Sequence, residues 1–193
     1  MVDPYADGLG DCRDAGDVAD RLLAKATSFS GAPMGNVQLM DRSHEVLTIT
    51  AQTGFGGEFL SAFAQVDAHG HSVCAEALKR REAVTVEDVR EATELAPYRA
   101  VFADAGVRAV RSVPLISRSG EMMGMVSVHF REPQKMDLAE LVTLARFGRL
   151  AADRLVSLSR DDASQAIAEA VSRRRPSKAN LIAWGKMGFK SKS

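Results

Sequence analysis

The sequence predicts an α+β fold in which helices from the two ends of the chain cover one face of a mainly antiparallel sheet. Three features of the 193 residues support this prediction. Strand-like segments follow one another in runs and do not alternate strictly with helices. Amphipathic helical patterns lie near both ends of the chain. Short helices and a long loop are left to roof the opposite face, where a cavity would suit a small molecule.

The N-terminal part is predicted to contain a leader, a helix and a hairpin. Residues 1–16 are rich in Asp and Gly and lack periodicity, which indicates a flexible acidic leader. Apolar residues recur at helical spacing after Asp17, the expected N-cap, and Gly31 ends the pattern. Alternating residues in 35–41 and 45–52 then predict two antiparallel strands joined by a turn.

The middle of the chain predicts a series of short elements. The stretches "EFLSAFAQV" and "VCAEALKR" each have the pattern of a short helix, and "AVTVEDV" has the pattern of a strand. The stretch "APYRAVFADAG" predicts a further helix that ends at Gly106. These elements are the expected roof of the cavity.

The clearest pattern lies in the second half of the chain. Two longer strands, 107–117 and 121–130, are joined by a turn that contains glycine. Since side chains alternate across a strand, Ser127 and His129 lie on the face opposite Val126 and its apolar neighbours. A long apolar stripe after these strands predicts a terminal helix from about residue 137 to residue 159.

These elements form one predicted domain, residues 17–158, followed by a short helix and a basic tail in residues 159–193. Trp184 and Phe189 stand among the lysines of this tail. Basic residues with aromatics can bind nucleic acid or an acidic membrane surface. No motif that reads bases is present, so we expect a solvated tail and no nucleic-acid partner.

Several observations predict a cytoplasmic protein. No apolar run has the roughly 18 to 20 residues that a membrane span needs. The first residues lack the basic and then apolar order of a secretory signal. Cys12 and Cys74 are far apart in the chain, so we expect two free thiols and no structural disulfide.

The segments "TGFGGEFLSAFAQVDA", "VCAEALKRREAVTVEDV" and "AGVRAVRSVPLISRSGEMMGMVSVHF" follow one another as in GAF domains of the bacterial sensory type. The sequence resembles this family over about residues 17–158. The resemblance implies a ligand cavity on the sheet face opposite the terminal helices, and a homodimer formed through those helices. We therefore expect a sensor of an unidentified small molecule that has no catalytic activity and acts on a separate partner protein in signal transduction.

Polar residues that alternate with apolar ones in the central strands are the expected ligand contacts. Each would cost on the order of 1 to 3 kcal/mol if it were buried without a partner, so a ligand, ordered water or cross-strand pairing must satisfy it. Cys74 is expected to line the cavity as a small apolar residue, and Tyr98 and Arg111 to orient a ligand from the roof. The predicted contacts are Asn36, Gln38, Cys74, Tyr98, Arg111, Ser112, Ser127 and His129.

His69, His71 and Cys74 form an H-x-H-x-x-C cluster. The cluster could hold zinc or copper, but no fourth ligand is apparent, so we expect a solvated turn and no metal. Ser72 as an N-cap would place Cys74 in a first helical turn, which favours a thiolate. The stretch "VCAEAL" also resembles free methionine sulfoxide reductases, whose chemistry needs further cysteines in the following loop, and residues 89–110 contain none. A thiol-dependent reductase and a scaffold with a filled pocket are the alternatives to a sensor.

Overall fold

The computed structural model describes residues 8–41 and 43–174, with side chains up to residue 166. Short elements occupy the middle of the chain, and the longest helix comes last. In chain order the elements are α1 (Ala15–Ser30), β1 (Met34–Asp41), β2 (Val46–Thr53), α2 (Gly57–Ala62), β3 (Gln65–Val66), α3 (Val73–Arg80), β4 (Val84–Val86), the 3-10 helix η1 (Thr93–Tyr98), α4 (Arg99–Asp104), β5 (Ala109–Ile116), β6 (Met122–Phe130) and α5 (Leu138–Arg174).

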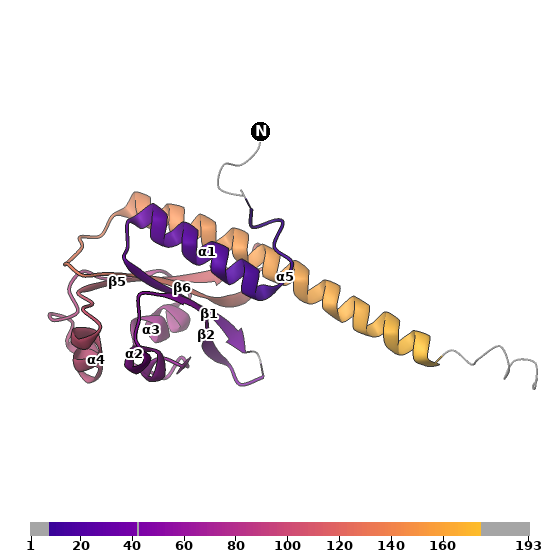
Figure 1. The fold of residues 1–193 in the computed structure, drawn as a ribbon, viewed down its shortest axis with the longest axis horizontal. Coiled ribbons are helices and arrows are strands. Elements are labelled where there is room, and N and C mark those ends of the chain that lie inside the picture. The colour runs from indigo at the N-terminus through magenta and orange to yellow at the C-terminus, as the bar shows by residue number, and fades with distance from the viewer. Residues whose placement is uncertain (1–7, 42, 175–193) are drawn as a thin grey trace, which may run out of the picture. The chain divides into compact units, whose positions relative to one another are not determined.

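The six strands form one antiparallel sheet with the order β3-β2-β1-β6-β5-β4. Helix α1 and the part of α5 up to Leu158 cover one face of this sheet, and α2, α3 and α4 lie on the other face (Figure 1). Each layer has its own apolar core. The predicted α+β architecture is therefore confirmed, and the layer of α2, α3 and α4 is called the roof below.

Helix α1 begins earlier than predicted. Asp14 is the N-cap, because its carboxylate accepts a hydrogen bond of 2.9 Å from the Asp17 backbone N–H. Asp17, the expected cap, lies in the first turn, where a negative charge also stabilises the helix. Leu9 and Cys12 are buried in the core beside this helix, so the described end of the predicted leader is packed against the domain.

The roof follows the sequence pattern closely in one place and loosely in two others. Helix α3 occupies the predicted residues, and the Ser72 hydroxyl accepts a hydrogen bond from the Ala75 N–H at its start. The helix predicted around Tyr98 is divided into η1 and α4, and η1 contains Pro97, which has no N–H to donate. The helix predicted for "EFLSAFAQV" ends at Ala62, and its last two residues form strand β3, which is too short to show the alternation of a strand.

The two central strands place polar side chains toward the roof. Val37 and Val126 belong to the core beneath α1 and α5, whereas Gln38 and His129 face the roof side. Strands β1 and β6 approach so closely at Gly124 that a Cβ there would lie 2.2 Å from the Gln38 carbonyl oxygen. This glycine is therefore required by the spacing of the strands.

Helix α5 is longer than predicted. The sequence analysis ended it at residue 159, yet it continues to Arg174 because no Gly or Pro interrupts residues 159–174. The first compact unit of the chain ends at Leu158. The basic tail with Trp184 and Phe189 lies outside the described residues. None of the helices in the described part of the chain combines the length and the apolar character that crossing a bilayer requires.

Candidate ligand site

A small cavity lies between the sheet and the roof, in the position that the sequence analysis predicts for a ligand. Its volume is about 10 Å³, which is the room of about one water molecule. Polar side chains come from the sheet and from α3, and aromatic side chains come from α2 and α4. The lining residues are Asn36, Gln38, Phe59, Phe63, Ser72, Val73, Cys74, Phe102, Val110 and His129.

Three polar atoms of this lining are buried without a hydrogen-bond partner among the described residues. They are Oδ1 of Asn36, Oε1 of Gln38 and Nδ1 of His129. The Gln38 amide orientation is fixed, because its Nε2 donates to the Phe63 carbonyl oxygen at 3.3 Å and leaves Oε1 free. Each unsatisfied group costs about 1–3 kcal/mol. The cavity is thus apolar where α2 and α4 line it and deficient in hydrogen-bond donors on its sheet side.

His129 is an uncharged member of this set. The rings of Phe55 and Phe59 meet its imidazole edge-on, with centroids at 4.9 Å and 5.6 Å. Burial removes water from the imidazole and lowers the pKa of His129 to about 3. At neutral pH the ring is therefore neutral and offers one donor and one acceptor.

Cys74, Ser112 and Ser127 satisfy one another. The two serines are opposite each other on β5 and β6, and their hydroxyl oxygens lie 2.8 Å apart. The Cys74 sulfur is 3.3 Å from the Ser127 hydroxyl oxygen and 3.6 Å from that of Ser112. Burial raises the pKa of the Cys74 thiol. The alternative of cross-strand pairing therefore applies to these serines, and the thiol is not an activated nucleophile.

Arg111 lies on the other side of the sheet, so its predicted place at the roof is wrong. Its guanidinium donates to Glu140 at 2.6 Å and to the Lys135 carbonyl oxygen at 2.8 Å. It also stacks on the Phe130 ring, at 4.9 Å from the centroid. The alternation of side chains along β5 explains the error, because Ser112 faces the roof and its neighbour must face the helices.

Aromatic residues build the roof side of the cavity. Phe55 and Phe59 are stacked at 3.8 Å, and Phe63 follows at 4.7 Å from Phe59. Tyr98 lies against Phe63 at 5.1 Å, half-buried, and is not among the residues that line the cavity. Phe102 lines it and was missed by the sequence analysis, because one aromatic in a short helix gives no sign of which way it faces.

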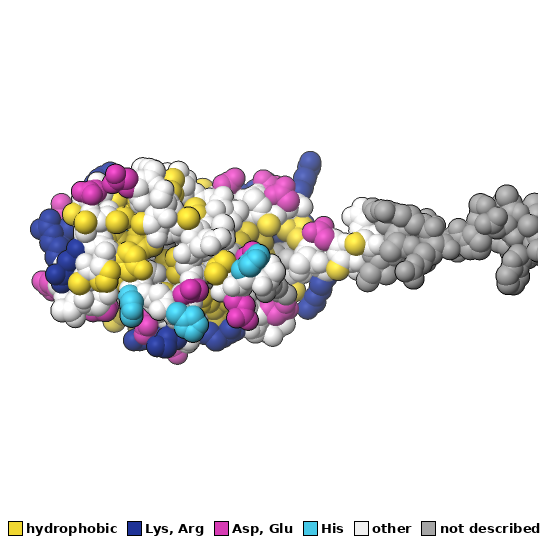
Figure 2. Space-filling model, turned by 90° about the horizontal axis from the view of Figure 1, so that it is seen from below, with side chains coloured by type: hydrophobic (Ala, Val, Ile, Leu, Met, Phe, Trp, Pro, Cys, Tyr) yellow, Lys and Arg dark blue, Asp and Glu magenta, His cyan; other side chains and the backbone are white. Residues whose placement is uncertain are grey.

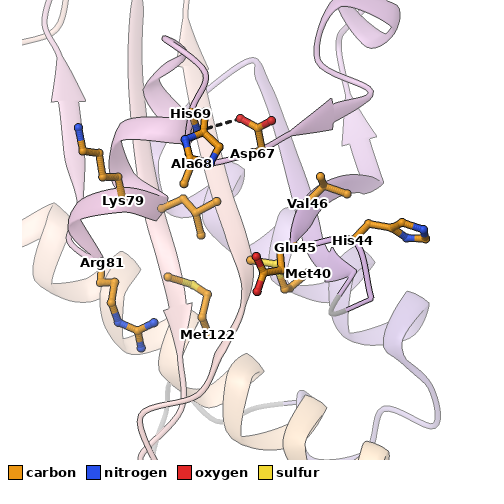
Figure 3. A pocket seen from close by; sticks show the side chains of 11 residues that line it. Met40, His44, Glu45, Val46, Asp67, Ala68, His69, Lys79, Arg81 and Met122 are labelled. Atoms are coloured by element: carbon orange, nitrogen blue, oxygen red, sulfur yellow. Dashed lines mark hydrogen bonds between the residues drawn. The ribbon is translucent and has the colours of Figure 1, made fainter.

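The cluster that contains His69, His71 and Cys74 does not act as one group. Both histidines are exposed, whereas the Cys74 sulfur is buried with the serines. Among the described residues, no group of three or more His, Cys, Asp or Glu side chains is placed to hold a metal ion. His69 lies instead at a surface groove, where its backbone N–H donates to the Asp67 carboxylate at 2.8 Å (Figure 3).

This groove is a second place where a ligand could be accommodated. It has a volume of about 670 Å³ and lies between the β1–β2 turn, the loop before α3 and the end of α3. Met40, Met122 and Glu45 are among its lining residues, and Figure 3 shows the carboxylate of Glu45 beside the Met40 side chain. Glu45 and Arg81, which both line the groove, have φ values of 55° and 57°, which are unusual for residues other than glycine.

An antiparallel sheet with helices on one face and a roofed cavity on the other defines the class of domain. The family model of the GAF domain matches residues 12–156, which is most of the 193-residue chain. The chain therefore belongs to the GAF domain family, whose members are typically small-molecule sensing and signalling domains. A comparison with curated proteins gave no match.

Solved structures support the same assignment of the fold. The GAF domain of a phosphoenolpyruvate-protein phosphotransferase from Coxiella burnetii has a TM-score of 0.70 and 11% identity, over 82% of this chain and 92% of the other. Free methionine-R-sulfoxide reductase from Neisseria meningitidis has a TM-score of 0.66 and 16% identity, over 81% of this chain and 87% of the other. A domain of a putative two-component sensor histidine kinase protein from Sinorhizobium meliloti has a TM-score of 0.61 and 18% identity, over 86% of this chain and 100% of the other. Identities this low establish the shared fold alone.

Proposed function

We propose that this protein is a cytoplasmic, non-enzymatic sensor in which residues 17–158 bind a small molecule between the sheet and the roof. The observation that carries the proposal is the set of three unpaired polar atoms, on Asn36, Gln38 and His129, in one buried cavity. A ligand with N–H or O–H groups would satisfy both amide oxygens, and its apolar part would contact Phe59 and its aromatic neighbours. Both cysteines are free, as expected in a reducing compartment.

The size of the cavity implies that the roof moves when the ligand binds. A space of about 10 Å³ admits one water and no larger molecule. The described structure then corresponds to a closed state, and the ligand selects an open state in which α2 and α4 move away from the sheet. The difference between the ligand's binding free energies for the open and the closed state sets the size of the population shift.

We further propose that the signal leaves through a homodimer and a separate partner protein. Three apolar side chains on the helix layer are exposed: Phe29 by 48%, Leu138 by 70% and Val142 by 53%. Leu138 and Val142 are four residues apart on α5 and so share one face of the helix. Exposed apolar residues of this kind support an interface on α1 and α5.

A scaffold that binds no ligand is the second candidate, because the cavity is nearly filled by the aromatic side chains of the protein itself. A reductase has less support, since the Cys74 thiol is buried and its pKa is raised. In the scaffold, one ordered water would satisfy the unpaired atoms.

Native mass spectrometry after incubation with a bacterial metabolite extract separates these candidates. The sensor predicts a bound small molecule that is released on denaturation. It also predicts loss of that molecule in Val110→Ile, which adds a methyl group to the cavity wall. Val86→Ile, on the neighbouring strand β4 outside the lining, is the matched control and should retain the molecule. A wild-type protein that takes up nothing at any extract concentration would favour the scaffold.

A further inference from the structure

A separate hollow lies at the end of the sheet, outside the roof helix α4. Its volume is about 550 Å³, within the range of small-molecule sites. Four arginines line it: Arg90 follows β4, Arg99 begins α4, Arg108 precedes β5 and Arg131 follows β6. Seen from the roof side in Figure 2, a group of dark-blue side chains lies at the end of the domain where Figure 1 places α4.

One of these arginines is already neutralised. The Arg108 guanidinium donates through Nε to Oδ1 of Asp88 at 3.2 Å and makes a second hydrogen bond to Oδ2. The same carboxylate accepts the Arg90 backbone N–H at 3.0 Å. These hydrogen bonds, led by those from Arg108, lower the pKa of Asp88 and keep it ionised. Asp88 is therefore engaged by Arg108, and the charge of Arg90 acts on it without a side-chain hydrogen bond or ion pair.

The other three guanidinium groups have no such partner. Within residues 8–41 and 43–174, the side chains of Arg90, Arg99 and Arg131 make no hydrogen bond or ion pair. Glu132 is the only acidic residue in the lining of this hollow in the described chain, and Glu91 acts on Arg108 from outside it. Four arginines line the hollow and three carboxylates act on Arg108, those of Asp88, Glu132 and Glu91, so a net positive charge of one remains.

The Arg131 guanidinium lies against the backbone that follows α4. A Cβ added to Gly106 would lie 2.7 Å from Nη1 of Arg131, so this guanidinium rests directly on the turn that ends α4. Gly106 has a φ of +68°, which side-chain-bearing residues rarely adopt. Arg131, which follows β6, and Arg99, which begins α4, line the hollow from the sheet and from the roof. One guanidinium group can donate two parallel hydrogen bonds to two oxygens of a phosphate. Several arginines in one hollow therefore suit a ligand with several phosphate oxygens.

We infer that this hollow binds a small phosphorylated anion, which bridges α4 and the end of β6. The site is distinct from the cavity, yet the two share α4, because Phe102 of the same helix lines the cavity. An anion that ties Arg99 to Arg131 holds α4 against the sheet and so favours the closed roof. Binding of the anion goes beyond the proposed function and does not depend on it, whereas its effect on the closed roof rests on that proposal.

Isothermal titration calorimetry with inorganic pyrophosphate at constant ionic strength tests this inference, and a parallel titration with a nucleoside triphosphate shows whether a nucleoside contributes. Saturable binding is expected in the wild type. It should weaken at least about tenfold in the double variant Arg99→Gln, Arg131→Gln, which loses two charge-assisted contacts. The control Arg13→Gln, Arg149→Gln removes the same charge from two exposed positions outside the hollow and should bind as the wild type does.

Hydrogen exchange gives a second readout. Pyrophosphate should slow exchange of the α4 amides in the wild type and in the control variant, and should leave it unchanged in the Arg99→Gln, Arg131→Gln variant. All four substituted arginines are exposed, so the melting temperatures of the variants should match that of the wild type. The inference is overturned if neither phosphate compound binds saturably. It is equally overturned if both double variants lose affinity to the same extent, because binding would then follow overall charge.

Discussion

The buried imidazole of His129 predicts a specific loss of stability in acid. Burial lowers the pKa of this group from 6.5 to about 3, while the unfolded chain keeps the usual value. Between these two pH values the unfolded state binds one more proton than the folded state. Stability is therefore complete above about pH 6.5 and falls as the pH is lowered toward about 3. The slope is about 1.4 kcal/mol per pH unit.

Urea denaturation of the wild type and of His129→Gln at pH 7, 6, 5 and 4.5 measures this contribution. Between pH 7 and pH 4.5 the wild type should lose roughly 2–3 kcal/mol more of its unfolding free energy than the variant, since the unfolded imidazole becomes protonated over this range and the folded one does not. All carboxylates and the other histidines are shared by the two proteins and cancel in the difference. His71→Gln, which replaces an exposed imidazole, should follow the wild type.

Parallel curves for the wild type and His129→Gln would refute this reasoning. They would mean that the imidazole reaches water or a carboxylate in the folded protein and titrates as it does in the unfolded chain. The three proteins should have equal m-values, because a change in m would signal a change in the surface exposed on unfolding.

Three further predictions concern the packing and the cysteine. Gly124→Ala should lose about 1–3 kcal/mol of unfolding free energy, because its Cβ would collide with the Gln38 carbonyl oxygen. Native protein should react with Ellman's reagent at Cys74 only as fast as it unfolds, since the thiol is buried and its pKa is raised. Glu140→Leu should lose about 3 kcal/mol in urea denaturation, because the buried Arg111 charge would be left without its carboxylate.

Each of these predictions has a control and a result that contradicts it. Gly10→Ala meets no atom within 4 Å and should change stability little, so an equal loss in both glycine variants would remove the steric reason. In denatured protein, two thiols per chain should react with Ellman's reagent. Rapid reaction of both thiols in the native protein would show that Cys74 is accessible. Glu76→Leu breaks an exposed pair with Arg80 and should cost less than about 1 kcal/mol. A similar effect of Glu140→Leu would show that its pair is equally screened.

Local sequence patterns predicted most of the helices and strands. The alternation of Val126 and Ser127 assigned the two faces of β6, and Ser72 marked the start of α3, because these features depend only on neighbouring residues. Asp17 was expected to be the cap of α1, yet Asp14, a residue of the same type, is the cap. Only the backbone geometry at the start of α1 distinguishes them.

The candidate site was predicted in part. The sequence analysis identified Asn36, Gln38 and His129, because a polar side chain in a buried central strand needs a hydrogen-bond partner whatever that partner is. Arg111 was misplaced because the alternation of side chains along β5, which puts it on the face opposite Ser112, was not applied to it. Its partner Glu140 is 29 residues away in the chain, and no local pattern joins the two. The nearly filled state of the cavity likewise depends on how Phe59 and Phe102 meet across the roof, at 6.3 Å between ring centroids.

A high-resolution crystal structure of the protein as purified from its host tests the central claim most directly. Our account predicts electron density for a molecule larger than water between the sheet and an open roof. That molecule would donate hydrogen bonds to Asn36 and Gln38 and contact His129. A cavity closed by the aromatic side chains, with the same three groups satisfied by one water or by each other, would contradict it.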